Sequence, residues 1–146
     1  MGLDLRDPAL AFEDIVAALD LRPHPEGGHF REIWRDRPEQ GGRGAATSIY
    51  FLLAEGEASR WHRVDAAELW LWHAGAPLRL GIAGPGGRRE HRLGPDLFAG
   101  ETLQAIVPAG DWQEAASLGV WTLVSCVVAP AFEFEGFEMA PEGWSP

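Results

Sequence analysis

The sequence contains no lysine and no asparagine, and all 12 of its basic residues are arginines, against 22 aspartates and glutamates. The missing lysine excludes Schiff-base chemistry and a phosphate-binding loop that ends in Gly-Lys-Ser/Thr. The missing asparagine excludes N-linked glycosylation. The formal net charge of −10 opposes the phosphate backbone of nucleic acid, so we expect no nucleic-acid partner.

Cysteine and long apolar runs are also scarce. The single cysteine, Cys126, excludes a disulfide within the chain and leaves a cysteine-based zinc site without ligands. No run approaches the ~18 consecutive apolar residues of a membrane-spanning helix. The acidic start over residues 1–4 lacks the basic and apolar regions of a signal peptide. We therefore expect a cytoplasmic protein with no membrane partner.

The hydrophobic pattern changes once along the chain, whose 146 residues are the size of about one domain. Up to Pro23, apolar residues recur at helical spacing, which predicts a helix over about residues 8–20 with Asp7 as its cap. After Pro23 the period is close to 2, and turns rich in glycine and proline separate short segments. These predict an all-β barrel over about residues 28–139, then a loose tail that Trp144 could anchor. The predicted strands are 29–35, 47–54, 60–64, 68–73, 78–83, 88–93, 104–107, 112–116, 120–128 and 132–139.

The densest polar cluster lies in a strand, tight turn and strand over residues 61–73. A hairpin there brings His62 and Glu68 together, since directly opposite residues on neighbouring strands are only ~5 Å apart. An imidazole and a carboxylate at that distance can hold a cation or tune each other for proton transfer. By alternation, Trp70 shares the face of Glu68, whereas His73 shares it only if a bulge interrupts the strand. Upstream, residues 24–28 contain a histidine and a glutamate, but their proline and glycine pair more simply mark a turn.

The spacing Gly56-x5-His62-x-Val64-x3-Glu68-x6-Gly75 resembles the first sequence motif of the cupin superfamily, Gly-x5-His-x-His-x3-4-Glu-x6-Gly, except that Val64 replaces the second histidine. Residues 100–117 resemble the second cupin motif more loosely. Further blocks resemble the small cupin family of unknown function catalogued as the fifth cupin family. Those blocks are residues 24–28, 47–53, 62–63 with 68–70, 100–104, 107–113 and 132–138.

This resemblance implies a double-stranded β-helix, the cupin jelly-roll barrel, with a ligand cavity and commonly a homodimer with exchanged N-terminal strands. In metal-binding cupins three histidines and one glutamate hold the ion, and their positions correspond here to His62, Val64, Glu68 and Gln113. Valine cannot ligate, and one imidazole with a carboxylate and an amide suits a transition metal poorly. We therefore expect that the protein has no cofactor. The less favoured alternative is a divalent metal held by His62, Glu68 and Gln113.

The leading hypothesis is that the barrel binds a small polar ligand, such as a sugar or nucleotide derivative. It would act as a metal-independent isomerase or epimerase with His62 as base and Glu68 beside it, an arrangement that resembles the sugar-nucleotide epimerases of the superfamily. The candidate substrate-binding residues are Trp70, Gln104, Gln113, His73 and the only tyrosine, Tyr50. Two alternatives stay open: a divalent-metal enzyme that uses His62, Glu68 and Gln113, and a non-catalytic ligand-binding or assembly module.

Overall fold

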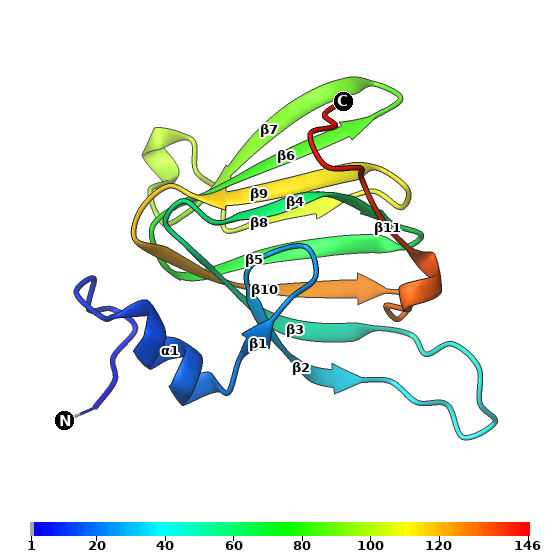
Figure 1. Ribbon diagram of the computed structural model, residues 1–146, viewed down its shortest axis with the longest axis horizontal. Helices are drawn as coiled ribbons and strands as arrows, with labels where there is room; N and C mark the ends of the chain where they lie inside the picture. The colour runs from blue at the N-terminus through cyan, green and yellow to red at the C-terminus, as the bar shows by residue number, and fades with distance from the viewer. Residues whose placement is uncertain (1) are drawn as a thin grey trace.

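The computed structural model describes residues 2–146, and its strands form two antiparallel sheets that face each other in a barrel (Figure 1). One sheet has the order β1-β2-β3-β10-β5-β8, and the other has the order β11-β4-β9-β6-β7. The elements are α1 (Phe12–Leu19), β1 (Arg22–Pro23), β2 (His29–Arg35), β3 (Thr47–Ala54), β4 (Ala58–Val64), β5 (Ala67–Gly75), β6 (Leu78–Gly84), β7 (Gly87–Leu93), β8 (Gln104–Val107), β9 (Trp112–Ser117), β10 (Trp121–Ala129) and β11 (Phe137–Met139), with 3-10 turns η1 (Leu97–Ala99) and η2 (Phe134–Gly136).

The expected all-β jelly-roll barrel with one N-terminal helix is confirmed. The strands predicted between residues 29 and 128 all form, with ends that differ by at most two residues. The segment predicted as a strand over residues 132–139 is different, because it begins with the 3-10 turn η2 and only its last three residues pair with β4. The backbone carbonyl of Gly136 accepts a hydrogen bond from the Asp65 amide, which docks this turn on the barrel.

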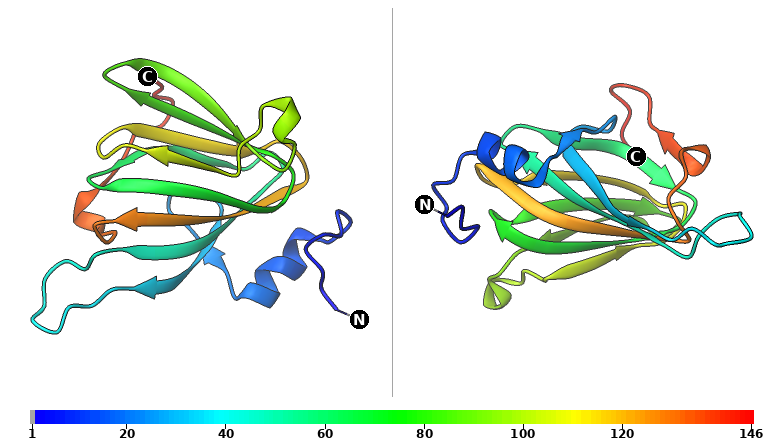
Figure 2. Two further views of the ribbon diagram at one scale, coloured as in Figure 1. Left: turned by 180° about the vertical axis from the view of Figure 1, so that it is seen from behind. Right: turned by 90° about the horizontal axis from the view of Figure 1, so that it is seen from below.

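Helix α1 begins four residues later than the sequence predicts. Asp7 accepts a hydrogen bond from the amide of Ala9 and so closes a turn before the helix, while Ala11 stands at the N-cap without a side-chain bond. The helix buries Ile15 against the outer face of β3 and β10, beside Leu52 and Leu123 (Figure 2). The helix therefore covers one sheet from outside and leaves the barrel interior open to other side chains.

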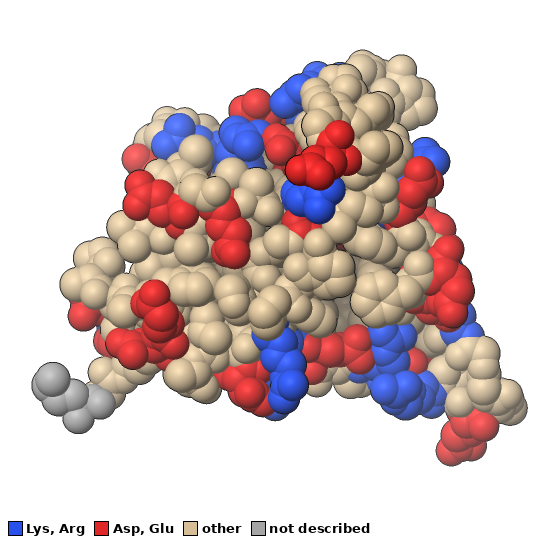
Figure 3. All heavy atoms as spheres, in the orientation of Figure 1, with Lys and Arg blue, Asp and Glu red and all other residues tan. Residues whose placement is uncertain are grey.

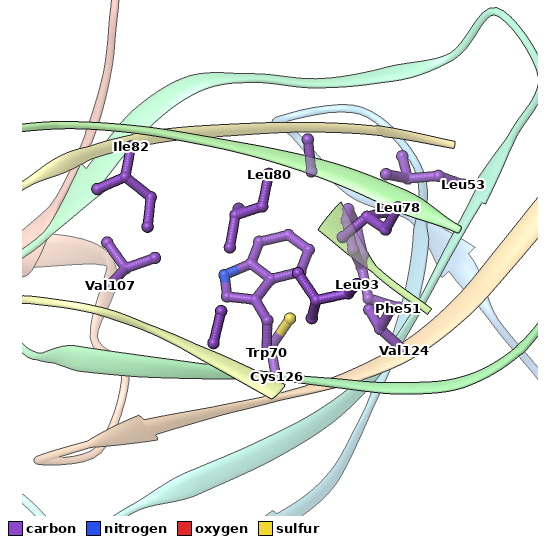
Figure 4. Packing of buried hydrophobic residues seen from close by; sticks show 12 residues of the cluster. Phe51, Leu53, Trp70, Leu78, Leu80, Ile82, Leu93, Val107, Val124 and Cys126 are labelled. Atoms are coloured by element: carbon purple, nitrogen blue, oxygen red, sulfur yellow. The ribbon is translucent and has the colours of Figure 1, made fainter. Parts of the chain in front are cut away.

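The hydrophobic core fills only part of that interior. Trp70 lies at its centre, 1% exposed, among aliphatic side chains from both sheets (Figure 4). The other core residues are Phe51, Leu53, Leu78, Leu80, Ile82, Leu93, Ala105, Val107, Ala115, Val124 and Cys126. The remaining interior, towards β1, β2, β4 and β11, contains a cavity instead.

Arginines tie the C-terminal segment to the open side of the barrel. Arg43 forms an ion pair with Asp65 at 2.7 Å and donates a hydrogen bond to the carbonyl of Ala131, while Arg35 donates one to the carbonyl of Phe132. These contacts hold a phenylalanine-rich segment over the cavity. Further along, the Trp144 ring packs 4.7 Å from the ring of Trp112, so it anchors the tail as the sequence suggests. Within residues 2–146, no helix has both the length and the apolar character needed to cross a membrane.

Candidate functional site

The cavity has a volume of about 490 Å³ and becomes more polar towards its inner end. Its walls are mainly apolar, its mouth carries arginines, and its inner end holds Glu26, His62 and Glu68, all of which are buried. Burying ionisable groups is costly unless each has partners. The partners of these three residues therefore define the chemistry of the site.

Glu26 reaches the cavity from the loop between β1 and β2. Gly27 and Gly28, with φ of 105° and 80°, let this loop fold against the barrel, and a Cβ at Gly28 would lie 2.8 Å from the Phe51 ring. One carboxylate oxygen of Glu26, Oε2, lies 2.6 Å from His62 Nε2 and accepts a 2.8 Å hydrogen bond from the Ser59 hydroxyl. Glu26 is thus held by two donors from strand β4.

The hydrogen bonds of His62 show where its protons are. Nδ1 lies 2.7 Å from the carbonyl of Arg60, which can only accept, so Nδ1 carries a proton. Burial alone would lower the pKa of His62, but the charge and hydrogen bond of Glu26 outweigh it and raise the pKa to about 9. Burial likewise acts to raise the pKa of Glu26, yet His62 and the Ser59 hydroxyl hold it below its usual value. Near neutral pH the two residues therefore form an imidazolium–carboxylate pair.

Glu68 is in a different state at the same inner end. Burial raises the pKa of its carboxyl group to about 7, while the charge of His62 and hydrogen bonds from Gln113 and the Cys126 thiol oppose that rise. Its Oε1 accepts a 3.0 Å bond from the amide nitrogen of Gln113, whose oxygen accepts a 2.8 Å bond from the indole of Trp70. An indole N–H can only donate, which fixes the orientation of the amide. Glu68 can therefore exchange a proton near neutral pH.

The other predicted ligand-binding residues divide into two groups. Trp70 and Gln113 lie behind Glu68 and position it without lining the cavity. Tyr50, Gln104 and His73 lie on the outer side of their sheet, which corrects the prediction that they contact a ligand in the barrel. Tyr50 packs in the cluster beneath α1, Gln104 is exposed on β8, and His73 lies 2.6 Å from the Ser125 hydroxyl. The pairing of β5 with β10 shifts register at His73, which lies between the paired residues Trp72 and Ala74, and this bulge leaves the His73 side chain exposed.

Sequence reasoning missed Glu26 as a site residue, together with its neighbour His24, whose Nδ1 lies 3.4 Å from Glu26 Oε1. The available signal was the pair of ionisable side chains in the turn over residues 24–28, which a turn alone does not require. It also missed the aromatic wall formed by Phe132, Phe134 and Phe137, because that segment has the alternation of an outer strand.

A metal ion of the kind that cupins often bind does not fit this donor set. Both ring nitrogens of His62 and both amide atoms of Gln113 are engaged by protein groups, and Val64 offers no donor. Across residues 2–146, the structure brings no three His, Cys, Asp or Glu side chains into an arrangement suited to a metal. The residues present therefore favour direct contact between ligand and side chains.

Two antiparallel sheets that enclose a cavity with ionisable residues at its inner end, and with His62 and Glu68 on strands that follow each other in sequence, define a cupin-type barrel. The chain belongs to the Cupin superfamily (DUF985) family, whose model matches residues 13–140. No curated protein matches the sequence.

Two solved structures share both fold and sequence with this chain. A protein from Shewanella oneidensis is 38% identical, with a TM-score of 0.84 over 90% of this chain and 85% of that one. A hypothetical protein from Leishmania major is 32% identical, with a TM-score of 0.81 over 90% and 88% of the two chains. More distantly, oxalate decarboxylase from Bacillus subtilis is 15% identical, with a TM-score of 0.64 over 94% of this chain and 33% of its own. The last comparison shows the fold alone.

Proposed function

We propose that the cavity binds a small polar ligand and catalyses a proton-transfer isomerisation, of the isomerase or epimerase class, without a metal. The observation that supports this most is the juxtaposition of Glu68, a buried carboxyl group held near neutral pKa, with the buried Glu26–His62 pair. General acid–base catalysis needs two groups whose pKa values are set apart by their environments. Both lie at the inner end of one cavity.

The chemistry begins with a ligand that has a C–H bond beside a carbonyl group. The carboxylate of Glu68 removes that proton, the C–H electron pair forms a C=C bond, and the carbonyl oxygen takes up the proton held by the Glu26–His62 pair. The neutral imidazole then removes the proton from the enol oxygen, which is the base role that the motif position of His62 suggests. Protonated Glu68 returns its proton to the former carbonyl carbon of an α-hydroxy ligand, which gives the isomer, or to the original carbon after the enol has turned over in the cavity, which gives the epimer. No electrons are gained or lost, so the reaction needs no cofactor.

The proton that the pair can transfer is the one between Nε2 and the Glu26 carboxylate, because Nδ1–H is held by a backbone carbonyl, that of Arg60, which does not take up a proton. Since Nε2 lies 2.6 Å from Glu26, the two residues share this proton and titrate as one unit. A small polar ligand fits the size of the cavity, which lies within the ~300–1,000 Å³ of small-molecule sites. A homodimer and a cytoplasmic location, both expected from the sequence, stay predictions.

The test is hydrogen exchange in D₂O, followed by proton NMR, with hydroxyacetone, glyceraldehyde and glucuronate as probes. The wild type should exchange the proton beside the carbonyl of at least one probe, and Glu68→Gln and His62→Gln should each slow this by about 10²-fold or more. Glu55→Gln, an exposed carboxylate on the loop after β3, is the matched control and should exchange at the wild-type rate. Absence of exchange with all three probes, or equal exchange by all variants, would favour the non-catalytic binding module instead.

A further inference from the structure

The residues that line the cavity include three arginines, Arg22, Arg31 and Arg35. Most arginines of this chain pair with a carboxylate, and Figure 3 shows basic and acidic side chains intermingled over the visible face. Arg35 follows this rule, because it binds Glu32 through two nitrogens at 2.9 Å. Arg22 and Arg31 are exceptions, since neither forms an ion pair with any residue from 2 to 146.

The fold directs the side chain of Arg22 into the cavity and that of Arg31 away from it. Arg22 pairs with Phe30 across β1 and β2, and directly opposite residues share a face of the sheet, so the side chain of Arg22 follows Phe30 into the cavity. Arg31 pairs with Tyr50 across β2 and β3, so its side chain lies on the outer face, where Nη1 is 3.4 Å from the carbonyl of Leu19 at the end of α1. Arg22 is therefore the arginine of the mouth whose guanidinium donors are free for a ligand.

Next to the arginines, phenylalanines form a wall of the cavity. The rings of Phe132 and Phe134 lie 5.0 Å apart at an interplanar angle of 81°, and Phe137 packs on both of them. Phe134 is 61% exposed although it lines the cavity, so part of its ring surface is free at the mouth. Exposed aromatic surface at a pocket is where the apolar or ring part of a ligand gains contact area.

We propose that the mouth is an oxyanion subsite, in which Arg22 binds a phosphate ester or carboxylate of a ligand whose ring packs on Phe134. Guanidinium groups match planar and tetrahedral oxyanions through paired N–H donors. Asp20 also lines the mouth, and its carboxylate opposes anion binding there, so the attraction to Arg22 has to exceed this repulsion. The subsite rests on the proposed function in that both use one cavity, and it names the class of ligand: a ring-bearing oxyanion whose other end reaches Glu68.

The test is isothermal titration calorimetry with phenyl phosphate, phenylacetate and the uncharged benzyl alcohol. The wild type should bind at least one of the two anions more tightly than the alcohol. The variant Arg22→Gln should lose about tenfold or more in affinity for that anion and none for benzyl alcohol, the loss expected for charge-assisted hydrogen bonds. Arg37→Gln, an exposed arginine that does not line the cavity, is the matched control and should bind all three like the wild type.

The outcomes separate the two oxyanion classes and the two proposals. If only phenyl phosphate binds more tightly than benzyl alcohol in an arginine-dependent way, the ligand group is a phosphate ester. If only phenylacetate does so, the ligand group is a carboxylate. Binding of the anions no tighter than the alcohol, or anion affinity unchanged in Arg22→Gln, overturns the subsite. Calorimetry measures binding only, so the two proposals can fail independently. If no proton exchange is found, the arginine-dependent affinity for anions still supports the subsite. If that affinity is not found, proton exchange at Glu68 still supports the proposed function.

Discussion

Two glutamates enter the same cavity, and their pKa values are shifted in opposite directions. Glu26 and Glu68 are each 6% exposed, so the extent of burial does not distinguish them. Glu26 faces an imidazolium and a hydroxyl donor, which hold its pKa below the usual value, whereas the close partners of Glu68 are an amide and a thiol, and its pKa rises to about 7. Charged and hydrogen-bonding neighbours, and not depth in the barrel, therefore determine the state of each carboxyl group.

The two states have opposite effects on stability as pH changes. The lowered pKa of Glu26 contributes stability at neutral pH that is lost as the pH falls through that pKa. The raised pKa of His62 contributes stability that is complete below 6.5 and is lost as the pH rises through about 9. For Glu68, the protonated form favours the fold, so its contribution is present below 4.5 and is lost as the pH rises through about 7. Each glutamate can therefore be tested separately.

The largest effect is expected from removing the partner of Glu26. In His62→Ala the Glu26 carboxylate is left buried without its counter-ion, which should lower the free energy of unfolding by about 3–5 kcal/mol at pH 7. Urea denaturation followed by circular dichroism measures this difference.

The matched control for this change is the double variant Glu26→Gln/His62→Gln, which removes both charges and keeps two hydrogen-bonding amides. It should be more stable than His62→Ala, because no buried charge remains unpaired. If the double variant is the less stable of the two, the imidazolium–carboxylate pair is not the main interaction of Glu26.

A smaller effect, of opposite sign, is expected at Glu68. The variant Glu68→Gln keeps the oxygen that accepts from Gln113 but removes the charge that forms above pH 7. The free energy of unfolding of this variant minus that of the wild type should be about 2–3 kcal/mol larger at pH 8 than at pH 5. This difference is the free energy that corresponds to the raised pKa of Glu68. Urea unfolding of both proteins at the two pH values gives the comparison. An equal difference at both pH values would mean that Glu68 titrates like an exposed carboxyl group.

The smallest effect, on the melting temperature, is expected from adding divalent metals. A bound metal would favour the ionised form of both glutamates. Adding Ni²⁺, Zn²⁺ or Mn²⁺ to the wild type should leave its melting temperature unchanged, because its nitrogen donors are engaged within the protein. The variant Val64→His/Gln113→His, which supplies three imidazoles beside Glu68, is the positive control and should melt at a higher temperature with Ni²⁺. A comparable rise in the wild type would show that a metal can displace the internal partners of His62.

His62, Glu68 and Gln113 could be predicted from the sequence because motif spacing along one hairpin and its neighbouring strand fixes their positions. Glu26 could not be predicted, because its contact with His62 joins segments that only the folded barrel brings together. Tyr50 was misplaced for another reason. Both faces of β3 are covered, the inner one by the core around Phe51 and the outer one by α1 over Leu52, so alternation of apolar residues does not show which face is interior.

The hydrogen-bonded chain from Trp70 through Gln113 to Glu68 also links the cavity to a chromophore. The indole of Trp70 is shielded from solvent, yet two hydrogen bonds connect its N–H to a carboxyl group that changes charge near neutral pH. Linked hydrogen bonds polarise one another, so a change of charge at Glu68 alters the electrostatic environment of the ring. Trp61 and Trp121 are buried as well, so the fluorescence change that is lost in Trp70→Phe is the intrinsic optical signal of what occupies the barrel.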